Sequence, residues 1–282
     1  MIYHNFEELT AQVLAQRAPR RCGVVLAKDE HTRQAVAQAE QEGLITPVYI
    51  DGDTPEEAMA HAVQLVHEGR VDMLMKGLLP TADFMRALVK RENGLRTGKL
   101  ISMLTMRKLP NYHKLIAMTD TGICEQPTLE QKKELIQNAV QALRAMGFDE
   151  PKVAVLSAAE TLNPHMSSSV DAAALKEMWQ AGQLPGCIVE GPISIDLALS
   201  HEAAEIKGYQ SPVAGEADLL LFPDLAAANI CGKLLAEVTG LPAGILILGT
   251  RVPAIVCSRA ATVETKRLCI ALAAACGGSN RS

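Results

Sequence analysis

A serine and an arginine follow an apolar run near the C-terminus of the chain. Residues 252–257 read Val-Pro-Ala-Ile-Val-Cys, and Ser258 and Arg259 come next. A hydroxyl and a planar guanidinium at the end of a strand suit a phosphate group, because the guanidinium can donate two parallel hydrogen bonds. A loop and a helix start are expected over 260–266, and the N–H groups of a helix start also favour anions. The pair therefore indicates an anion site, with a solvated arginine as the alternative.

A second segment repeats this chemistry. An expected strand over 71–75 runs into Lys76 and Gly77, Thr81 stands where it would cap the next helix, and Arg86 follows one turn into that helix. A cation, a hydroxyl and a helix start together can hold a phosphate ester. An ordinary capped helix with a surface arginine fits the spacing equally well, so both interpretations stay open.

Motifs for several other chemistries are missing. The sequence has no phosphate-binding P-loop, no dinucleotide-binding Gly-x-Gly-x-x-Gly after the first expected strand, and no Gly-x-Ser-x-Gly. It has no Cys-x-x-Cys and no histidines at metal-ligand spacing, so we expect no metal. Cys124 is a candidate nucleophile in a loop, although a lone cysteine beside an apolar run is more often inert.

The composition limits the class of protein. Of 282 residues 48% are hydrophobic, 21% are charged and 3% are aromatic, with a net charge of −5. There is no basic block, no apolar stretch of membrane-spanning length and no leader-like start, so we expect neither nucleic-acid nor membrane binding and no signal peptide. The odd count of 7 scattered cysteines indicates free thiols in a reducing cytoplasm.

Short apolar runs alternate with amphipathic stretches along the chain. Strands are expected over 22–27, 47–50, 71–75, 100–106, 114–119, 152–156, 187–190, 218–222, 243–248 and 252–257. Helices are expected over 29–42, from 54, and over 82–90, 128–146, 170–181, 196–206, 226–239 and 263–276. This alternation predicts an α/β protein with mainly parallel sheets. Its ligands would bind beyond the carboxyl ends of the strands.

The clearest helix is 128–146. Thr128 and Gln131 form a capping-box pattern, an apolar stripe follows, and Gly147 stands where the helix should end. No linker divides the chain, so this long helix is the natural place for it to pass from one domain to the next.

Several segments together resemble the phosphate acetyl/butyryltransferase family, and its butyryl branch more than its acetyl branch. They occur in the family's order over nearly the whole chain: 76–81, 120–122, 127–132, 138–140, 151–154, 160–164, 190–196, 214–218, 222–224, 229–233, 258–259 and 264–266.

The resemblance implies a two-domain fold like that of the isocitrate and isopropylmalate dehydrogenases, with an interdomain cleft. Residues 1–135 and 242–282 would form the first domain and residues 136–241 the second. It also implies a homodimer, and the reaction of acyl-CoA with phosphate to give acyl phosphate and CoA. No metal and no cofactor beyond coenzyme A as a substrate would be needed.

The resemblance also assigns roles. Arg259 would bind phosphate, and Ser258 would hydrogen-bond to phosphate or to the oxyanion of the reaction. Lys76, Thr81 and Arg86 would complete the anion site or contact the phosphates of CoA. Asp120 and Asn229 are two further substrate-binding candidates.

Two departures from the family pattern concern this site. The acetyl branch has an aspartate, a candidate base, where this chain has Thr265, so Glu264 and Glu160 become the hypotheses for the base. The family usually has glycine where this chain has Ala228, whose methyl group could narrow the site. We therefore expect a phosphate acyltransferase that prefers butyryl. The alternatives are a phosphate acetyltransferase, a non-catalytic acyl-CoA sensor, and an oxidoreductase of the same fold.

Overall fold

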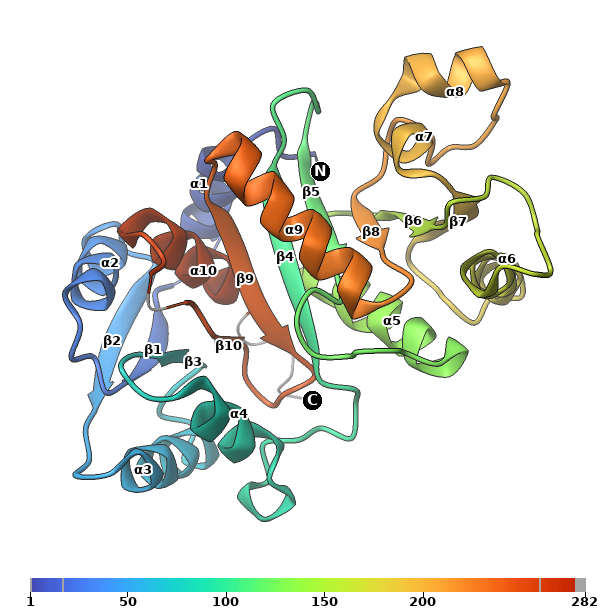
Figure 1. Ribbon diagram of the computed structural model, residues 1–282. Helices are drawn as coiled ribbons and strands as arrows, with labels where there is room; N and C mark the ends of the chain where they lie inside the picture. Colours follow the sequence, from blue (N-terminus) through green and yellow to red (C-terminus); the bar gives the residue numbers. More distant parts are fainter. Residues whose placement is uncertain (1, 17, 259, 277–282) are drawn as a thin grey trace. The chain divides into compact units, whose positions relative to one another are not determined.

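The computed structural model describes residues 2–16, 18–258 and 260–276 (Figure 1). The chain forms two compact units. The N-terminal unit comprises Phe6–Ile101 and Pro242–Ser282, and the central unit comprises Met1–Asn5 and Ser102–Leu241. The first segment of the N-terminal unit thus ends at residue 101, and the chain returns to this unit at residue 242. The reason is that residues 102–119 form two strands that pair with the sheet of the central unit.

The N-terminal unit contains five strands in the order β2-β1-β3-β10-β9. They are β1 (Arg20–Val25), β2 (Ile45–Ile50), β3 (Met73–Lys76), β9 (Ala243–Leu248) and β10 (Ala254–Ile255). The pairs β1/β2, β1/β3 and β3/β10 are parallel, and β9/β10 is antiparallel. The strand expected over 252–257 is reduced to two residues, in part because Pro253 has no N–H to donate to the sheet.

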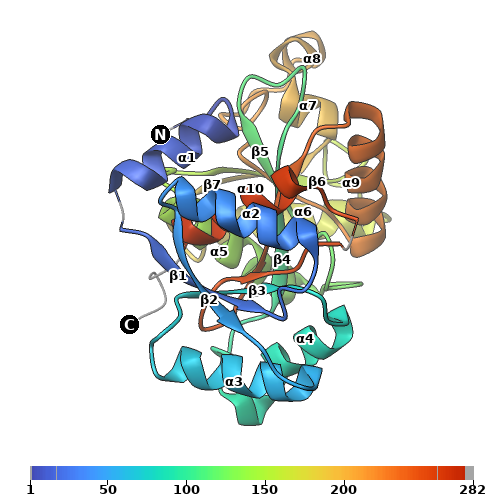
Figure 2. The same cartoon turned by 90° about the vertical axis from the view of Figure 1, so that its left-hand side faces the viewer.

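Helices cover both faces of this sheet (Figure 2). One face carries α1 (Phe6–Gln16), α2 (Glu30–Gln41) and α10 (Val263–Cys276), and the other carries α3 (Pro55–His67), α4 (Thr81–Val89) and the short 3₁₀ helix η1 (Arg91–Asn93). Residues 268–276 of α10 are all buried. This run is apolar on all sides, as a helix enclosed by other elements requires.

The central unit contains strands in the order β4-β5-β8-β6-β7. They are β4 (Ser102–Lys108), β5 (Leu115–Thr119), β6 (Lys152–Leu156), β7 (Ile188–Ile193) and β8 (Leu219–Leu221). Only β4/β5 is antiparallel, and β5/β8, β6/β8 and β6/β7 are parallel. Both units thus confirm the expected α/β class with mainly parallel strands.

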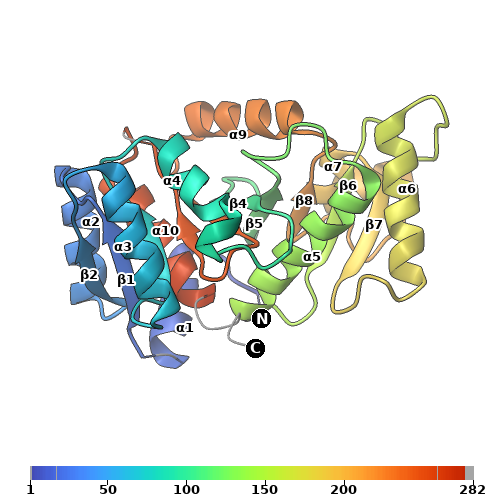
Figure 3. The ribbon, with the colours of Figure 1, turned by 90° about the horizontal axis from the view of Figure 1, so that it is seen from below.

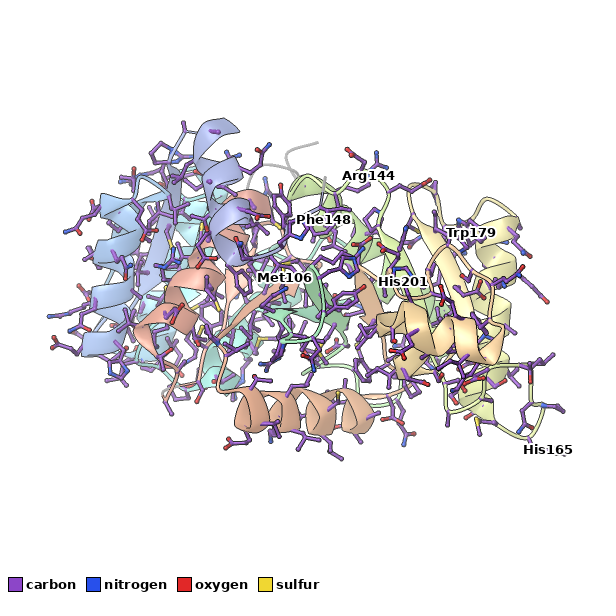
Figure 4. All side chains as sticks on the ribbon, turned by 90° about the horizontal axis from the view of Figure 1, so that it is seen from above. Met106, Arg144, Phe148, His165, Trp179 and His201 are labelled. Carbon is purple, nitrogen blue, oxygen red and sulfur yellow. The ribbon has the colours of Figure 1, made fainter. Side chains whose placement is uncertain are left out.

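The helices of the central unit lie on both faces of its sheet (Figure 3). They are α5 (Leu129–Ala145), α6 (Ser167–Gln180), α7 (Ile195–Leu199), α8 (His201–Lys207) and α9 (Leu225–Thr239). The helix expected over 196–206 is divided at Ser200, whose backbone is extended and whose hydroxyl accepts a hydrogen bond from the N–H of Ala203 to cap α8. The first residue of α8 is His201 (Figure 4).

The capping-box pattern predicted at residue 128 is confirmed, because the side chains of Thr128 and Gln131 form the capping box of α5. The structure adds a second capping box, formed by Thr54 and Glu57 at the start of α3. Gly147 has φ 105° just beyond α5, as its position suggested. Within the described residues, none of the helices has the length and apolar character needed to cross a membrane. The same residues contain no group of three or more His, Cys, Asp or Glu side chains arranged to hold a metal ion.

Candidate functional site

The strand ends of the N-terminal unit bring Lys76 and Ser258 to one edge of its sheet. Strands β3 and β10 are parallel and pair Leu74 with Ala254 and Met75 with Ile255. Lys76 is the next residue of β3, and Ser258 lies three residues beyond Ile255. Ser258 is exposed, and its hydroxyl accepts a hydrogen bond from the N–H of Ala260. Arg259 lies outside the described residues.

Lys76 is held in a tight turn. The residue is only 4% exposed, and its ammonium donates hydrogen bonds to the carbonyls of Gly77 (3.2 Å) and Leu79 (3.1 Å). A Cβ on Gly77 would lie 2.3 Å from the carbonyl oxygen of Leu26, so only glycine fits there. The close contact between this turn and the end of β1 therefore fixes the position of the Lys76 backbone.

A second buried lysine reaches the same edge from α10. The ammonium of Lys266 donates a hydrogen bond to the hydroxyl of Thr32 (3.0 Å) and lies 3.7 Å from a carboxylate oxygen of Asp29. Asp29 caps the N-terminus of α2, which follows β1. The edge thus combines two buried cations with the starts of α2 and α10, an arrangement that favours anions. Lys266 was not among the residues that sequence analysis selected, although a lysine in a helix with an otherwise apolar buried face was a usable signal.

The expected roles of Thr81 and Arg86 receive less support. Thr81 is the first residue of α4, but the N-cap is Pro80 and no side chain caps this helix, so the prediction of a threonine cap was wrong. The guanidinium of Arg86 donates a hydrogen bond to Asp83 (2.6 Å) and lines a pocket of about 270 Å³ together with residues of α3 such as Met59. Arg86 is therefore engaged within the α3–α4 surface.

The first turn of α10 contains Thr265 and Glu264, the two residues on which the choice of base depends. The hydroxyl of Thr262 accepts a hydrogen bond from the N–H of Thr265 (3.1 Å), and the hydroxyls of Thr262 and Thr265 lie 3.2 Å apart. Thr265 thus takes part in capping α10. Glu264 stands beside it, exposed, where the N-terminal end of a helix favours a carboxylate.

In the central unit, Asp120 and Asn229 lie on either side of one loop. The Asp120 carboxylate, 3% exposed, accepts hydrogen bonds from the N–H groups of Met103 (3.2 Å), Gly122 (2.7 Å) and Ile123 (2.9 Å). The amide of Asn229 on α9 donates a hydrogen bond to the carbonyl of Thr121 (3.3 Å). The structure brings the two residues together, and both of them hold the loop that follows β5.

Burial raises the pKa of two side chains in this loop, those of Asp120 and Cys124. It raises the pKa of Asp120, and the three backbone hydrogen bonds oppose that shift. Burial, with the neighbouring Asp120 carboxylate, also raises the pKa of the Cys124 thiol to about 12. A neutral thiol is a weak nucleophile, so the geometry supports the inert alternative for Cys124.

Glu160 belongs to a separate polar cluster in the central unit. Its carboxylate accepts hydrogen bonds from the ammonium of Lys207 (2.5 Å) and the hydroxyl of Ser194 (3.0 Å). The hydrogen bond from Lys207 lowers the pKa of Glu160. A carboxylate whose charged form is stabilised in this way is a weak base.

Comparisons with known proteins identify the family of this chain. The family model described as phosphate acetyl/butaryl transferase matches residues 28–274. A phosphate acetyltransferase of Thermotoga maritima is 38% identical over 93% of this chain and 96% of its own length. The chain belongs to the phosphate acetyl/butyryltransferase family. A phosphate butyryltransferase of Clostridium acetobutylicum is 36% identical over 98% of this chain and 99% of its own length.

A solved structure of this family has the same fold. It is a branched-chain phosphotransacylase from Enterococcus faecalis, with a TM-score of 0.83 and 28% identity over 91% of this chain and 99% of that one. The resemblance found in the sequence is therefore confirmed, together with the fold class that it implied.

The expectation that Ala228 narrows the ligand site needs correction. Ala228 is fully buried in the apolar core of the central unit, which also includes Met118 and Leu220. Its methyl group fills core space and exposes no surface with which it could narrow a ligand site, so the expected effect of this departure is not supported.

Proposed function

We propose that this family member transfers a short acyl group between coenzyme A and inorganic phosphate, so that acyl-CoA and phosphate give acyl phosphate and CoA. The observation that carries the proposal is the position of Lys76 and Ser258 at the ends of the paired strands β3 and β10. The relatives named for phosphate acetyl and butyryl transfer, each matched over more than nine tenths of its length, support the same reaction.

The proposed site acts by positioning and by charge. A phosphate oxygen attacks the thioester carbonyl, an oxyanion develops, and the CoA thiolate leaves. Holding both substrates removes much of the entropic barrier, and fixed donors stabilise the developing charge. Arg259 would bind phosphate in bidentate fashion, Ser258 would donate to the phosphate or the oxyanion, and the buried ammonium of Lys76 would supply positive charge. No metal or cofactor beyond CoA takes part in this scheme.

The remaining site residues have secondary roles in the proposal. Thr81 would contact CoA from the first residue of α4 and Arg86 from its last turn, while Asp120 and Asn229 would shape the substrate-binding loop after β5. Glu264 and Glu160 remain the two proposed bases. Glu264 is the stronger candidate, because it lies six residues from Ser258 and Glu160 is paired with Lys207.

The preference for one acyl group is tested by comparing the rates with four acyl-CoA substrates. Purified protein with phosphate and acetyl-, propionyl-, butyryl- or isobutyryl-CoA should release free thiol, fastest with butyryl-CoA. The 38% identity to a phosphate acetyltransferase supports acetyl as the second candidate, and a higher kcat/KM with acetyl-CoA would establish it. CoA binding without phosphate-dependent thiol release from any of the four would remove the catalytic proposal and favour a sensor.

The proposed setting is the cytoplasm, without nucleic-acid or membrane partners. It is supported by the cysteines, since no disulfide joins any of the seven in the part of the chain that the structure describes.

The proposed oligomer is a homodimer, and the exposed face of α9 supports it. Ile230, Leu234 and Val238 recur every four residues there and are 68%, 60% and 74% exposed. Lys233 and Glu237 flank this stripe. If two copies of α9 pack antiparallel about a twofold axis near Leu234, the lysine of each copy faces the glutamate of the other. The stripe and its charges are thus self-complementary.

A further inference from the structure

Two buried thiols lie next to each other beside Ser258. The Sγ atoms of Cys257, the residue before Ser258, and of Cys269 on α10 are 3.3 Å apart and share a hydrogen bond. The two side chains are 3% and 0% exposed. Neither thiol has a part in the proposed acyl transfer, so their proximity requires another explanation.

The pair is close to the geometry of a disulfide. An S–S bond is about 2.05 Å long, so the two sulfur atoms would need to approach by about 1.2 Å. Cys269 is the better anchored of the two, because its Sγ accepts a hydrogen bond from the N–H of Ile245 on β9 (3.1 Å) and its helix is buried. Cys257 lies beyond the last residue of the short strand β10, so most of the movement would fall on the segment that carries Ser258.

The surroundings distinguish Cys257 from the other buried cysteines. The hydrogen bond with Cys269, and then the charges of Lys266 and Lys76, lower the pKa of Cys257 although burial opposes this. In contrast, burial raises the pKa of Cys22 to about 12. The thiolate is the form that reacts with an oxidant, and these surroundings favour the thiolate at Cys257 more than at Cys22.

We propose that Cys257 and Cys269 form a reversible disulfide when the protein meets a peroxide, and that this bond switches off the anion site at Ser258. The consequence for activity rests on the proposed acyl transfer, whereas the formation of the bond does not. A displacement of about 1 Å at a site that works by positioning is enough to cost on the order of 100-fold in rate.

The oxidation balances with hydrogen peroxide as the electron acceptor. The Cys257 thiolate attacks one peroxide oxygen, the O–O bond breaks, and the departing hydroxide takes up the thiol proton to become water. The sulfur of Cys269 then attacks the resulting sulfenic sulfur. The S–S bond forms, the S–O bond breaks, and the hydroxide leaves with the Cys269 proton as a second water. The two sulfurs lose two electrons and the peroxide gains them.

Peptide mapping tests the bond without any activity assay. The reduced full-length protein is treated with hydrogen peroxide, alkylated and digested with trypsin. Cys257 then lies in peptide 252–259 and Cys269 in peptide 268–281. We expect a disulfide-linked pair of these peptides, and a fall in titratable thiols from 7 in the reduced protein to 7 − 2 = 5. Acyl transfer should fall by a factor of about ten or more and return after dithiothreitol.

Matched variants identify the partners. Cys276 lies on the same helix and in the same tryptic peptide as Cys269, so Cys276→Ser should keep the crosslink and the loss of activity. Cys269→Ser should lose the crosslink and keep its activity in peroxide. If circular dichroism shows that this variant is misfolded, Cys269→Ala replaces it. Together with the peptide map of the wild-type protein, that variant shows whether Cys269 is the partner of Cys257.

Two results would overturn the proposal. One is a native protein whose Cys257 stays fully alkylatable after peroxide treatment. The other is a crosslinked protein with an unchanged rate. Absence of acyl transfer before any oxidation would instead contradict the proposed function, and the mapping would still test the disulfide.

Discussion

The buried ammonium of Lys266 donates a hydrogen bond to the hydroxyl of Thr32 and thereby connects the first turn of α10 to the first turn of α2. Transfer of an ammonium from water to the protein interior costs free energy. The hydroxyl of Thr32 and the Asp29 carboxylate 3.7 Å away offset only part of that cost. A cation kept at such a position, beside the ends of β3 and β10, is consistent with an anionic ligand.

The first prediction separates stability from anion binding at Lys266. Lys266→Met should change the free energy of unfolding by less than about 1 kcal/mol, since relief from the burial of a charge offsets the lost hydrogen bond. The same change should raise the KM for phosphate by about tenfold or more, which corresponds to about 1.4 kcal/mol. Urea denaturation and steady-state kinetics measure the two quantities. A large loss of stability with an unchanged KM would make Lys266 a purely structural residue.

The second prediction concerns Arg259. Arg259→Ala should lower kcat/KM by about 100-fold or more while leaving the fold intact, because a bidentate donor to a phosphate group has no substitute at that position. Arg251→Ala is the control, since Arg251 is an exposed arginine that precedes β10. Kinetics with varied phosphate and a circular dichroism spectrum test the pair. Near-normal turnover of Arg259→Ala would remove this residue from its proposed role.

The third prediction distinguishes the two proposed bases. Glu264→Gln should slow CoA-dependent formation of acyl-CoA from acyl phosphate and flatten the acidic limb of its pH–rate profile. Glu160→Gln should leave that limb in place, because the hydrogen bond from Lys207 lowers the pKa of Glu160. Rates measured between pH 5 and 9 compare the two variants. An unchanged profile for Glu264→Gln would show that neither its carboxylate nor its charge takes part.

The fourth prediction is a loss of stability in acid that depends on Glu216. Burial opposes ionisation of this carboxyl, but the hydrogen bond from His201 and the charges of Lys114 and His113 hold its pKa at about 2. Because the folded-state pKa lies below the unfolded value, this stabilisation is present above pH 4.5 and is lost as the pH falls toward 2. The difference between the two pKa values corresponds to a free energy on the order of 3 kcal/mol.

Urea denaturation between pH 6 and pH 3 tests this prediction against Glu216→Gln. The variant should be less stable than the wild type at pH 6, and the gap should narrow as the pH falls. Parallel curves would show that Glu216 titrates normally in the folded protein.

The fifth prediction concerns association through α9. Leu234→Glu should convert the proposed dimer into a monomer, since it places two carboxylates near the twofold axis and removes apolar contact. Ile206→Glu is the matched control, because Ile206 is 78% exposed on α8 and lies outside the stripe. Light scattering coupled to gel filtration measures the mass. A wild-type monomer at micromolar concentration, or a dimer that Leu234→Glu leaves intact, would contradict the proposed interface.

Features determined by neighbouring residues could be predicted from the sequence. Thr128 and Gln131 are three residues apart, and the capping box that they form depends on little else. The alternation of strands and helices likewise predicted the α/β class. The prediction that Thr81 caps α4 was wrong for an equally local reason, since Pro80 immediately before it takes the N-cap position.

Features that require distant segments to meet could not be predicted. The partner of Lys266 is Thr32, which is 234 positions away in the sequence, and no local pattern connects the two. The proximity of Cys257 and Cys269 depends on how α10 packs beside β9. The position of Glu160 next to Lys207 depends on the break between α7 and α8, which the helical pattern over 196–206 did not reveal.

The N-terminal unit is assembled from two distant parts of the chain, and this has a consequence during synthesis on the ribosome. Strand β10 lies between β3 and β9, and α10 packs against α2. Strands β9 and β10 and helix α10 all come from residues 243–276, so the sheet that begins at residue 20 stays incomplete until these residues have been made. The central unit draws nearly all of its residues from one continuous stretch that leaves the ribosome earlier, so it can fold first. Until the late elements are made, the strands of the N-terminal unit expose apolar surface that is buried in the finished protein.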